Sequence, residues 1–151
     1  MRPFGPAALR LCVGTVFLAH GLQKFGLWGS PGLGGTANLL AGLGLVPAYP
    51  LAIVTAVAEL GGGALLIAGG LTRWVALVLL VEQVFAVWKV NITNGYYLST
   101  PDGGPGAEYR LILIGAMVCL ALTGPGAVSL DEWRNSSEEA KAAGRARARK
   151  V

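Results

Sequence analysis

The chain has 151 residues, of which 54% are apolar and only 13% charged, and its mean hydropathy is +0.59. A typical soluble domain carries roughly 25% charged residues. These values exclude an ordinary soluble domain and a disordered chain, and they favour a small integral membrane protein. Nucleic acid is not an expected partner, because half of the basic residues lie in the C-terminal tail and no basic stripe carries interleaved aromatics.

Four apolar segments follow one another along the chain and predict membrane-spanning helices. They cover about residues 9–28, 51–67, 74–90 and 109–122. A spanning helix needs ~20 residues, and glycine is tolerated inside it. A cleaved signal peptide is not favoured for the first segment, because the apolar run continues into His20 and Lys24 without a small-residue cleavage site.

The connections between these segments differ in kind. Within a first, Gly- and Pro-rich connection, residues 36–45 predict a short interfacial helix capped by Thr36. The next link, residues 69–73, predicts a tight turn between antiparallel helices, and residues 91–107 predict a polar loop with Asn-Gly and Pro-Asp-Gly turn chemistry. After a four-helix, all-α membrane domain at residues 1–130, the charged, Ala-rich residues 131–151 predict a frayed helix or a disordered tail.

The distribution of basic residues predicts the orientation of the helices. Arg2, Arg10, Arg73 and the basic tail all fall on one side of a four-span bundle, whereas the two long loops on the other side carry only Asp102. We therefore expect a multi-pass protein with both termini in the cytoplasm. The basic tail is also suited to contact anionic membrane lipids.

Several ionisable residues lie inside the apolar segments, where each costs at least ~2.5 kcal/mol at a helix centre. The candidates for a ligand site or proton relay are His20, Lys24, Glu59, Glu82, Lys89 and Glu108. The helical rise places His20 ~16 Å and the two membrane-embedded glutamates ~12 Å from their helix ends, near the middle of the ~30 Å apolar layer. Helical spacing puts His20 and Lys24 on one face of the first segment, and Glu82 and Lys89 on one face of the third. We therefore expect a polar core in the outer half of the bundle, in which lysines offset glutamates.

Other readings of these residues remain open. The lysines can extend to the outer interface, and the glutamates can hold helices together without binding anything. Phe85 and Trp88 are candidates for stacking on a planar ligand, whereas Gly61, Gly62 and Gly63 predict close helix packing. One histidine and two separated cysteines predict neither a metal site nor a disulfide framework.

The order and spacing of several short motifs resemble the DoxX family of small bacterial membrane proteins. The motifs are Arg10, His20–Gly26, Ala58–Gly62, Gly69–Arg73, Asn94–Tyr97, Glu108–Tyr109, Gly124–Gly126 and Ser129–Asp131. The resemblance covers nearly all of residues 10–131. Two positions depart from the family pattern: Glu82 stands where an apolar residue is expected, and Lys89 where a histidine is common.

The resemblance implies a four-helix protein of the bacterial plasma membrane. Some relatives are described as subunits of a thiosulfate:quinone oxidoreductase or of a terminal quinol oxidase. We therefore expect an accessory subunit in quinone-linked redox chemistry, with a quinone or quinol as the candidate ligand and no settled catalytic residue. The chain has no haem ligand pair, flavin motif or Fe–S cysteine set, so electrons would come from a redox protein partner. The alternatives are a small-solute transporter, for which a homo-oligomer is expected, and a scaffold without chemistry of its own.

Overall fold

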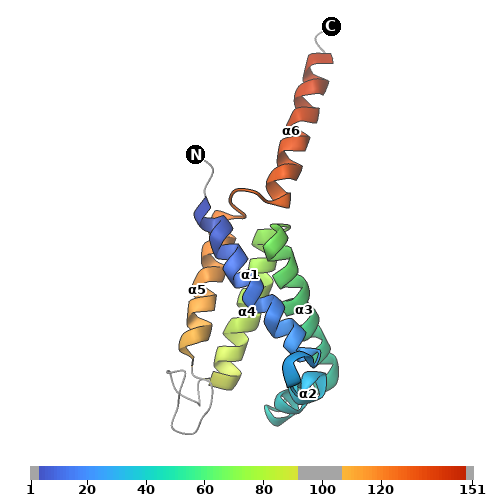
Figure 1. Ribbon diagram of the computed structural model, residues 1–151, viewed down its shortest axis with the longest axis vertical. Coiled ribbons are helices and arrows are strands. Elements are labelled where there is room, and N and C mark those ends of the chain that lie inside the picture. Colours follow the sequence, from blue (N-terminus) through green and yellow to red (C-terminus); the bar gives the residue numbers. More distant parts are fainter. Residues whose placement is uncertain (1–3, 92–106, 149–151) are drawn as a thin grey trace.

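The computed structural model describes residues 4–91 and 107–148, and every element in these two ranges is helical (Figure 1). In chain order the elements are α1 (Phe4–Lys24), the 3₁₀ turn η1 (Leu27–Gly29), α2 (Gly32–Gly42), α3 (Ala48–Ala68), α4 (Thr72–Ala86), the π-helical turn η2 (Val87–Asn91), α5 (Glu108–Thr123) and α6 (Leu130–Ala148). The all-α expectation is therefore confirmed. Within these two ranges, α1 and α3 are the helices long and apolar enough to cross a membrane, at 21 residues each.

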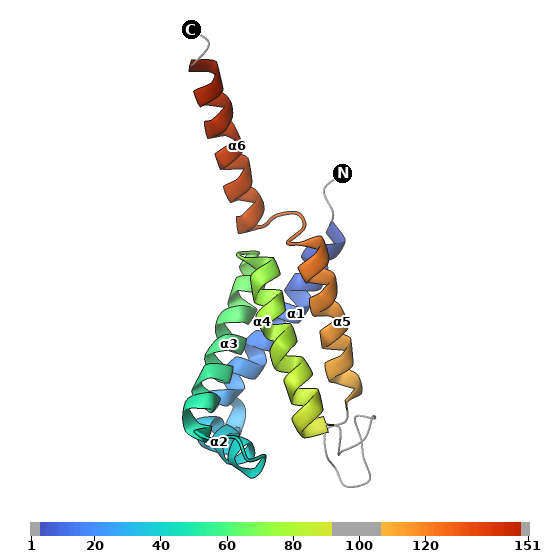
Figure 2. The same cartoon turned by 180° about the vertical axis from the view of Figure 1, so that it is seen from behind.

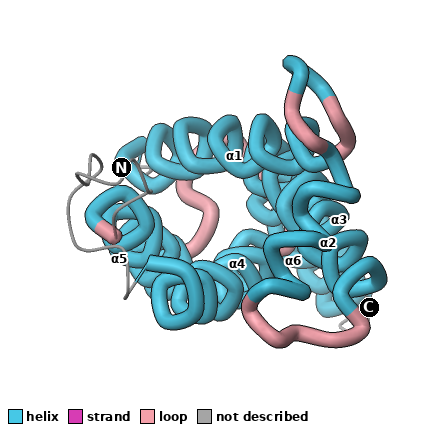
Figure 3. Tube along the Cα trace, turned by 90° about the horizontal axis from the view of Figure 1, so that it is seen from below, coloured by secondary structure: helices cyan, strands magenta, loops and turns pink. Residues whose placement is uncertain are grey.

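Each of the four apolar segments forms a helix, and these helices pack on one another. Helix α1 runs along α3, and α4 runs along α5, so that the four lie around a common interior when the molecule is seen from below (Figure 3). The tight turn after Ala68 makes α3 and α4 antiparallel neighbours, as expected. All four helices supply fully buried side chains to the core, which include Phe17, Leu66, Leu79, Met117 and Leu120.

The short helix in the first connection is present but begins earlier than predicted. Helix α2 starts at Gly32 after Pro31, whose fixed backbone angle suits a helix start. The prediction that Thr36 caps this helix is wrong, because its hydroxyl lies within the helix and donates to the carbonyl oxygen of Gly32 at 3.2 Å. Helix α2 packs mainly on α3, at the end of the molecule opposite to α6 (Figures 1 and 2).

The charged tail forms helix α6, one of the two forms expected for it. Ser129 caps the helix by accepting a hydrogen bond from the backbone N–H of Glu132 at 3.1 Å, and the Glu132 carboxylate accepts one from the N–H of Val128 at 3.1 Å. These contacts resemble a capping box, and the alanine-rich sequence that follows favours helix. Most of the predicted polar loop, residues 92–106 with Tyr96 and Tyr97, lies outside the described residues.

Arg10 on α1 holds the end of α3 and the segment between α5 and α6 in place. Arg10 is only 2% exposed, and among the described residues every hydrogen bond from its guanidinium goes to a backbone carbonyl oxygen. The acceptors are those of Leu66 (3.0 Å), Ile67 (2.5 Å), Pro125 (3.0 Å), Ala127 (3.3 Å) and Val128. Arginine has five N–H donors, so this arrangement can satisfy a buried guanidinium completely. It also supplies partners for carbonyls at the end of α3 and in the segment before α6.

Asp131 joins α6 to the start of α4 at the same end of the molecule. Its carboxylate accepts hydrogen bonds from the backbone N–H groups of Leu71 at 2.8 Å and Thr72 at 2.9 Å, and its own N–H donates to the carbonyl of Gly69 at 3.0 Å. An aspartate at the start of α4 satisfies free N–H groups and interacts favourably with the helix dipole. Leu71 has a left-handed backbone (φ 50°) that is uncommon for a non-glycine residue, and these contacts hold it there.

Glycines allow the backbones of α1 and α3 to touch. A methyl group at Gly63 would lie 2.4 Å from the backbone nitrogen of Leu18, and one at Gly21 would lie 2.5 Å from that of Leu60. At Gly62 it would meet the Leu79 side chain on α4 at 3.1 Å, whereas at Gly61 nothing lies within 4 Å. The prediction of close helix packing therefore holds for Gly63 and Gly62, and Gly61 faces away from the neighbouring helices.

Gly63→Ala is expected to destabilise the protein by about 1–3 kcal/mol, since the added methyl group meets backbone that cannot move aside. Gly61→Ala is the matched control and is expected to be neutral or to stabilise by up to ~1 kcal/mol through helix propensity. The measurement is the free energy of unfolding of both variants in the same detergent. Equal stability of the two variants would contradict the packing of α1 on α3.

Candidate functional site: a charged pocket beside α2

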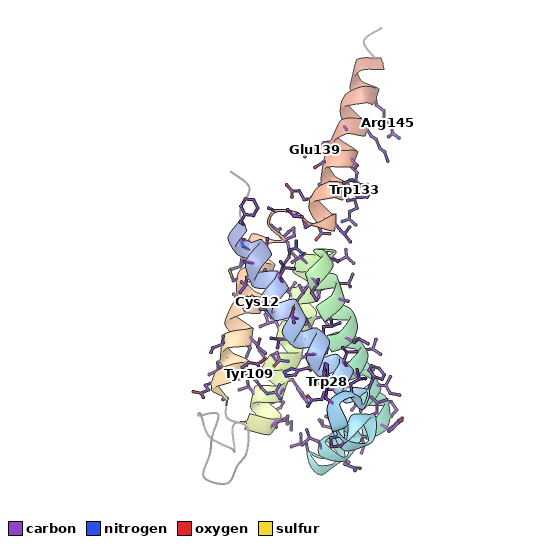
Figure 4. The ribbon with its side chains drawn as sticks, in the orientation of Figure 1. Cys12, Trp28, Tyr109, Trp133, Glu139 and Arg145 are labelled. Carbon is purple, nitrogen blue, oxygen red and sulfur yellow. The ribbon has the colours of Figure 1, made fainter. Side chains whose placement is uncertain are left out.

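A cavity of about 610 Å³ lies at the end of the molecule where α2 packs, between α1, α2, α3, α4 and the first turn of α5. This volume falls in the range of small-molecule sites. Polar side chains lining it are His20, Gln23, Lys24, Ser30, Thr36, Thr55, Glu59, Glu82 and Arg110. In the same half, Tyr109 sits near the start of α5 and Trp28 follows α1, while Cys12 lies on α1 toward the other end (Figure 4).

Lys24 and Glu59 form an ion pair across the packed helices α1 and α3. The Glu59 side chain is 3% exposed and that of Lys24 is 23% exposed, so both charges are largely removed from water. Lys24 thus offsets the charge of Glu59, as the sequence predicted. Because α1 and α3 meet through glycine, the two side chains can reach each other across the contact.

Glu82 on α4 is the second carboxyl group in the cavity. It lines the same cavity as Glu59, and the two carboxyl groups interact. One of its oxygens, Oε2, is buried and has no hydrogen-bond donor among the described residues. A hydrogen bond between two carboxyl groups needs a proton on one of them, because an ionised carboxylate can only accept. The two glutamates are thus arranged to hold a proton between them.

Arg110 and Gln83, which were not among the sequence candidates, link α5 to α4 at the cavity. Arg110 on α5 lines it and donates a hydrogen bond from Nη1 to the side-chain oxygen of Gln83 at 3.1 Å. Gln83 is 1% exposed and lies next to Glu82 on α4. The sequence contained a signal for each of them. Gln83 is a second polar residue beside Glu82 in an apolar segment, and Arg110 is a charged residue two positions after Glu108.

His20 lies in the cavity beside α5, as the helical spacing with Lys24 predicted. Its ring meets Tyr109 edge-to-face, with ring centroids 6.2 Å apart and an angle of 74° between the planes. The imidazole lines the same cavity as the charged side chains of Lys24, Glu59 and Arg110. Histidine can both donate and accept a proton near neutral pH, which suits a polar ligand site.

Three of the sequence candidates do not line the cavity: Lys89, Trp88 and Glu108. Lys89 instead places its ammonium 4.4 Å above the Trp88 ring, and Trp88 is 59% exposed. The physical reason is the π-helical turn η2, whose wider turn shifts the positions that follow Ala86. Val90 therefore faces the cavity where an ideal α-helix was expected to present Lys89. Of the two aromatic candidates, Phe85 alone is at the pocket.

The walls of the cavity away from the charges are apolar. Helix α2 supplies Leu39 and Leu40, α4 supplies Phe85, and the turn η2 supplies Val90. Leu39 is 53% exposed and Phe85 is 39% exposed, whereas Glu59 is buried. The rim thus exposes mainly apolar side chains, with the polar Gln23 among them, whereas the floor is charged. The floor consists of Lys24, Glu59, Glu82 and Arg110. Within the ranges 4–91 and 107–148, no three His, Cys, Asp or Glu side chains group in a way that could hold a metal ion.

Either Lys24→Met or Glu59→Gln alone is expected to destabilise the protein by about 3–5 kcal/mol when it leaves the partner charge buried. The double variant is expected to lose less than the sum of the two single losses, because neither charge is then left unpaired. The measurement is the free energy of unfolding in detergent of the wild type, the two single variants and the double variant. Glu108→Gln is the control, because Glu108 is a carboxylate outside the cavity. Additive losses would show that the two side chains do not interact.

Comparison with known proteins places this architecture in a family. The family model DoxX matches residues 5–92. The chain is 34% identical over 129 residues to a Bacillus subtilis (strain 168) protein named "Putative oxidoreductase CatD", covering 85% of this chain and 86% of the relative. It is 30% identical over 134 residues to the Escherichia coli (strain K12) "Inner membrane protein YphA", covering 86% and 90%. No solved structure matches the chain. The chain therefore belongs to the DoxX family of membrane proteins.

Proposed function

We propose that this protein binds a quinone or quinol in the charged pocket and acts as an accessory subunit in quinone-linked redox chemistry. The observation that carries the proposal is the division of one cavity into a charged floor and an apolar rim. A quinone has the same division, with two ring oxygens that form hydrogen bonds and an apolar ring and chain.

The floor offers suitable partners for the ring oxygens. Lys24 and Arg110 carry more N–H groups than their contacts with Glu59 and Gln83 use, and His20 can add one. Glu59 and Glu82 can accept or release protons as a ring is reduced or oxidised. Phe85 and the leucines of α2 suit the ring face and the chain.

The redox part of the proposal draws on a relative and on what this sequence lacks. CatD carries an oxidoreductase name, and it aligns with most of this chain. The sequence contains no flavin motif, haem ligand pair or Fe–S cysteine set. A ligand site without an electron carrier fits a subunit that presents a quinone to a redox protein partner.

The same proposal includes the topology, a four-helix bundle in the plasma membrane with both termini in the cytoplasm. Helix α4 with η2 is 20 residues long and α5 is 16 residues long, so both approach the length of α1 and α3. The N-terminal end of α1 and helix α6 lie at the end with Arg10 and Arg73, which supports a basic, cytoplasmic side (Figure 1).

Reporter fusions test this topology. A fluorescent protein fused to the C-terminus is expected to fluoresce, whereas alkaline phosphatase fused at the same position is expected to be inactive, because the C-terminus lies in the cytoplasm.

Thr55→Phe tests the site without touching a charge. Thr55 lines the cavity from α3, so a phenyl ring there is expected to fill part of the space and lower bound quinone at least about tenfold. Ile53→Phe is the control on the same helix, because Ile53 is 39% exposed and does not line the cavity. The measurement is quinone per protein, by mass spectrometry of extracts from gently purified protein.

Equal quinone in Thr55→Phe and Ile53→Phe would contradict binding in this cavity. The proposed function would be contradicted if purified wild-type protein contains no quinone and also fails to bind added short-chain quinone. In that case solute uptake into proteoliposomes becomes the next experiment, since charged membrane interiors also serve transport.

A further inference from the structure

We infer that the pocket selects the reduced, hydroxyl-bearing form of its ring ligand, with Glu82 as the residue that makes the choice. This inference rests on the proposed function and adds which redox form of the ligand is held. Its starting point is the balance of hydrogen-bond donors and acceptors at the charged floor.

The floor has one acceptor that no protein group satisfies. Oε2 of Glu82 is buried without a donor among the described residues, although Glu82 lies close to Glu59. Glu59 already accepts from Lys24, and the amide oxygen of Gln83 already accepts from Arg110. The proton that the two glutamates share lies between them, so the lone pairs of Oε2 stay without a donor, and a buried acceptor left unpaired is costly. A bound ligand that donates a hydrogen bond would remove this cost.

The two redox forms of a quinone differ in this property. A quinone has two carbonyl oxygens and can only accept, so it can use Lys24, Arg110 or His20 but leaves Glu82 unsatisfied. A quinol has two hydroxyl groups, each of which can donate and accept. One hydroxyl can donate to Glu82 while either hydroxyl accepts from the cationic side chains, so the quinol satisfies more of the floor than the quinone does.

The position of Glu82 allows this contact. It lies one turn before Phe85 and Ala86 on α4, and all three line the same cavity. A ring packed against Phe85 would therefore bring an oxygen substituent toward the Glu82 carboxyl group. Glu108, in contrast, starts α5 and is not among the cavity-lining residues.

The test measures the binding of a decyl-substituted benzoquinone and of its dithionite-reduced quinol, both without oxygen, by calorimetry on the full-length protein in detergent. Wild-type protein is expected to bind the quinol at least about tenfold more tightly. For a two-electron couple, a tenfold preference raises the midpoint potential of the bound ligand by about 30 mV. Glu82→Gln keeps the shape but adds an N–H donor that suits a carbonyl, so its preference is expected to fall to near one.

Glu108→Gln is the matched control and is expected to keep the wild-type preference. Equal or tighter binding of the quinone by wild-type protein would overturn the inference while the proposed function stands. A preference that survives in Glu82→Gln would assign the selection to another residue and also overturn it. Failure of wild-type protein to bind either form would refute the proposed function itself. The wild-type ratio decides the inference even if Glu82→Gln does not fold.

Discussion

The carboxyl group of Glu59 sets the main constraint on this molecule, because it lies almost completely buried in the middle of an apolar helix. An unpaired charge there would be too costly to keep, so a cation must reach it. Lys24 does so from α1, and it can because Gly21 and Gly63 let the two helix backbones touch. The close contact of α1 and α3 and the charge pair at its end therefore depend on each other.

The opposite end of the molecule meets a similar constraint in another way. Arg10 is as deeply buried as Glu59, but its partners are backbone carbonyl oxygens rather than a carboxylate. The five hydrogen bonds use all the N–H donors of the guanidinium, so Arg10 has none left for a ligand. At the pocket, in contrast, the charged groups leave acceptor and donor capacity unused. One end is thus built for stability, and the other keeps polar groups available.

The sequence predicted the centre of the site but not its surroundings. His20, Lys24, Glu59 and Glu82 could be brought together from helical periodicity and depth alone, since a charged residue in an apolar helix must face protein. The contribution of α2 could not be predicted, because its leucines follow no charge or spacing that marks them as pocket walls. The prediction placed Lys89 at the pocket because an apolar sequence pattern does not reveal a π-helical turn. That turn shifts the helix by one position, so that Val90 lines the cavity in place of Lys89.

The most direct test of a ligand held between the charged floor and the apolar rim is photoaffinity labelling with a short-chain azidoquinone, followed by peptide mapping. The account predicts cross-links on α2 and α4, near Leu39 and Phe85, that excess unlabelled quinol removes. Cross-links confined to outward-facing positions such as Ile112, which is 70% exposed, or labelling that excess quinol does not reduce, would contradict it.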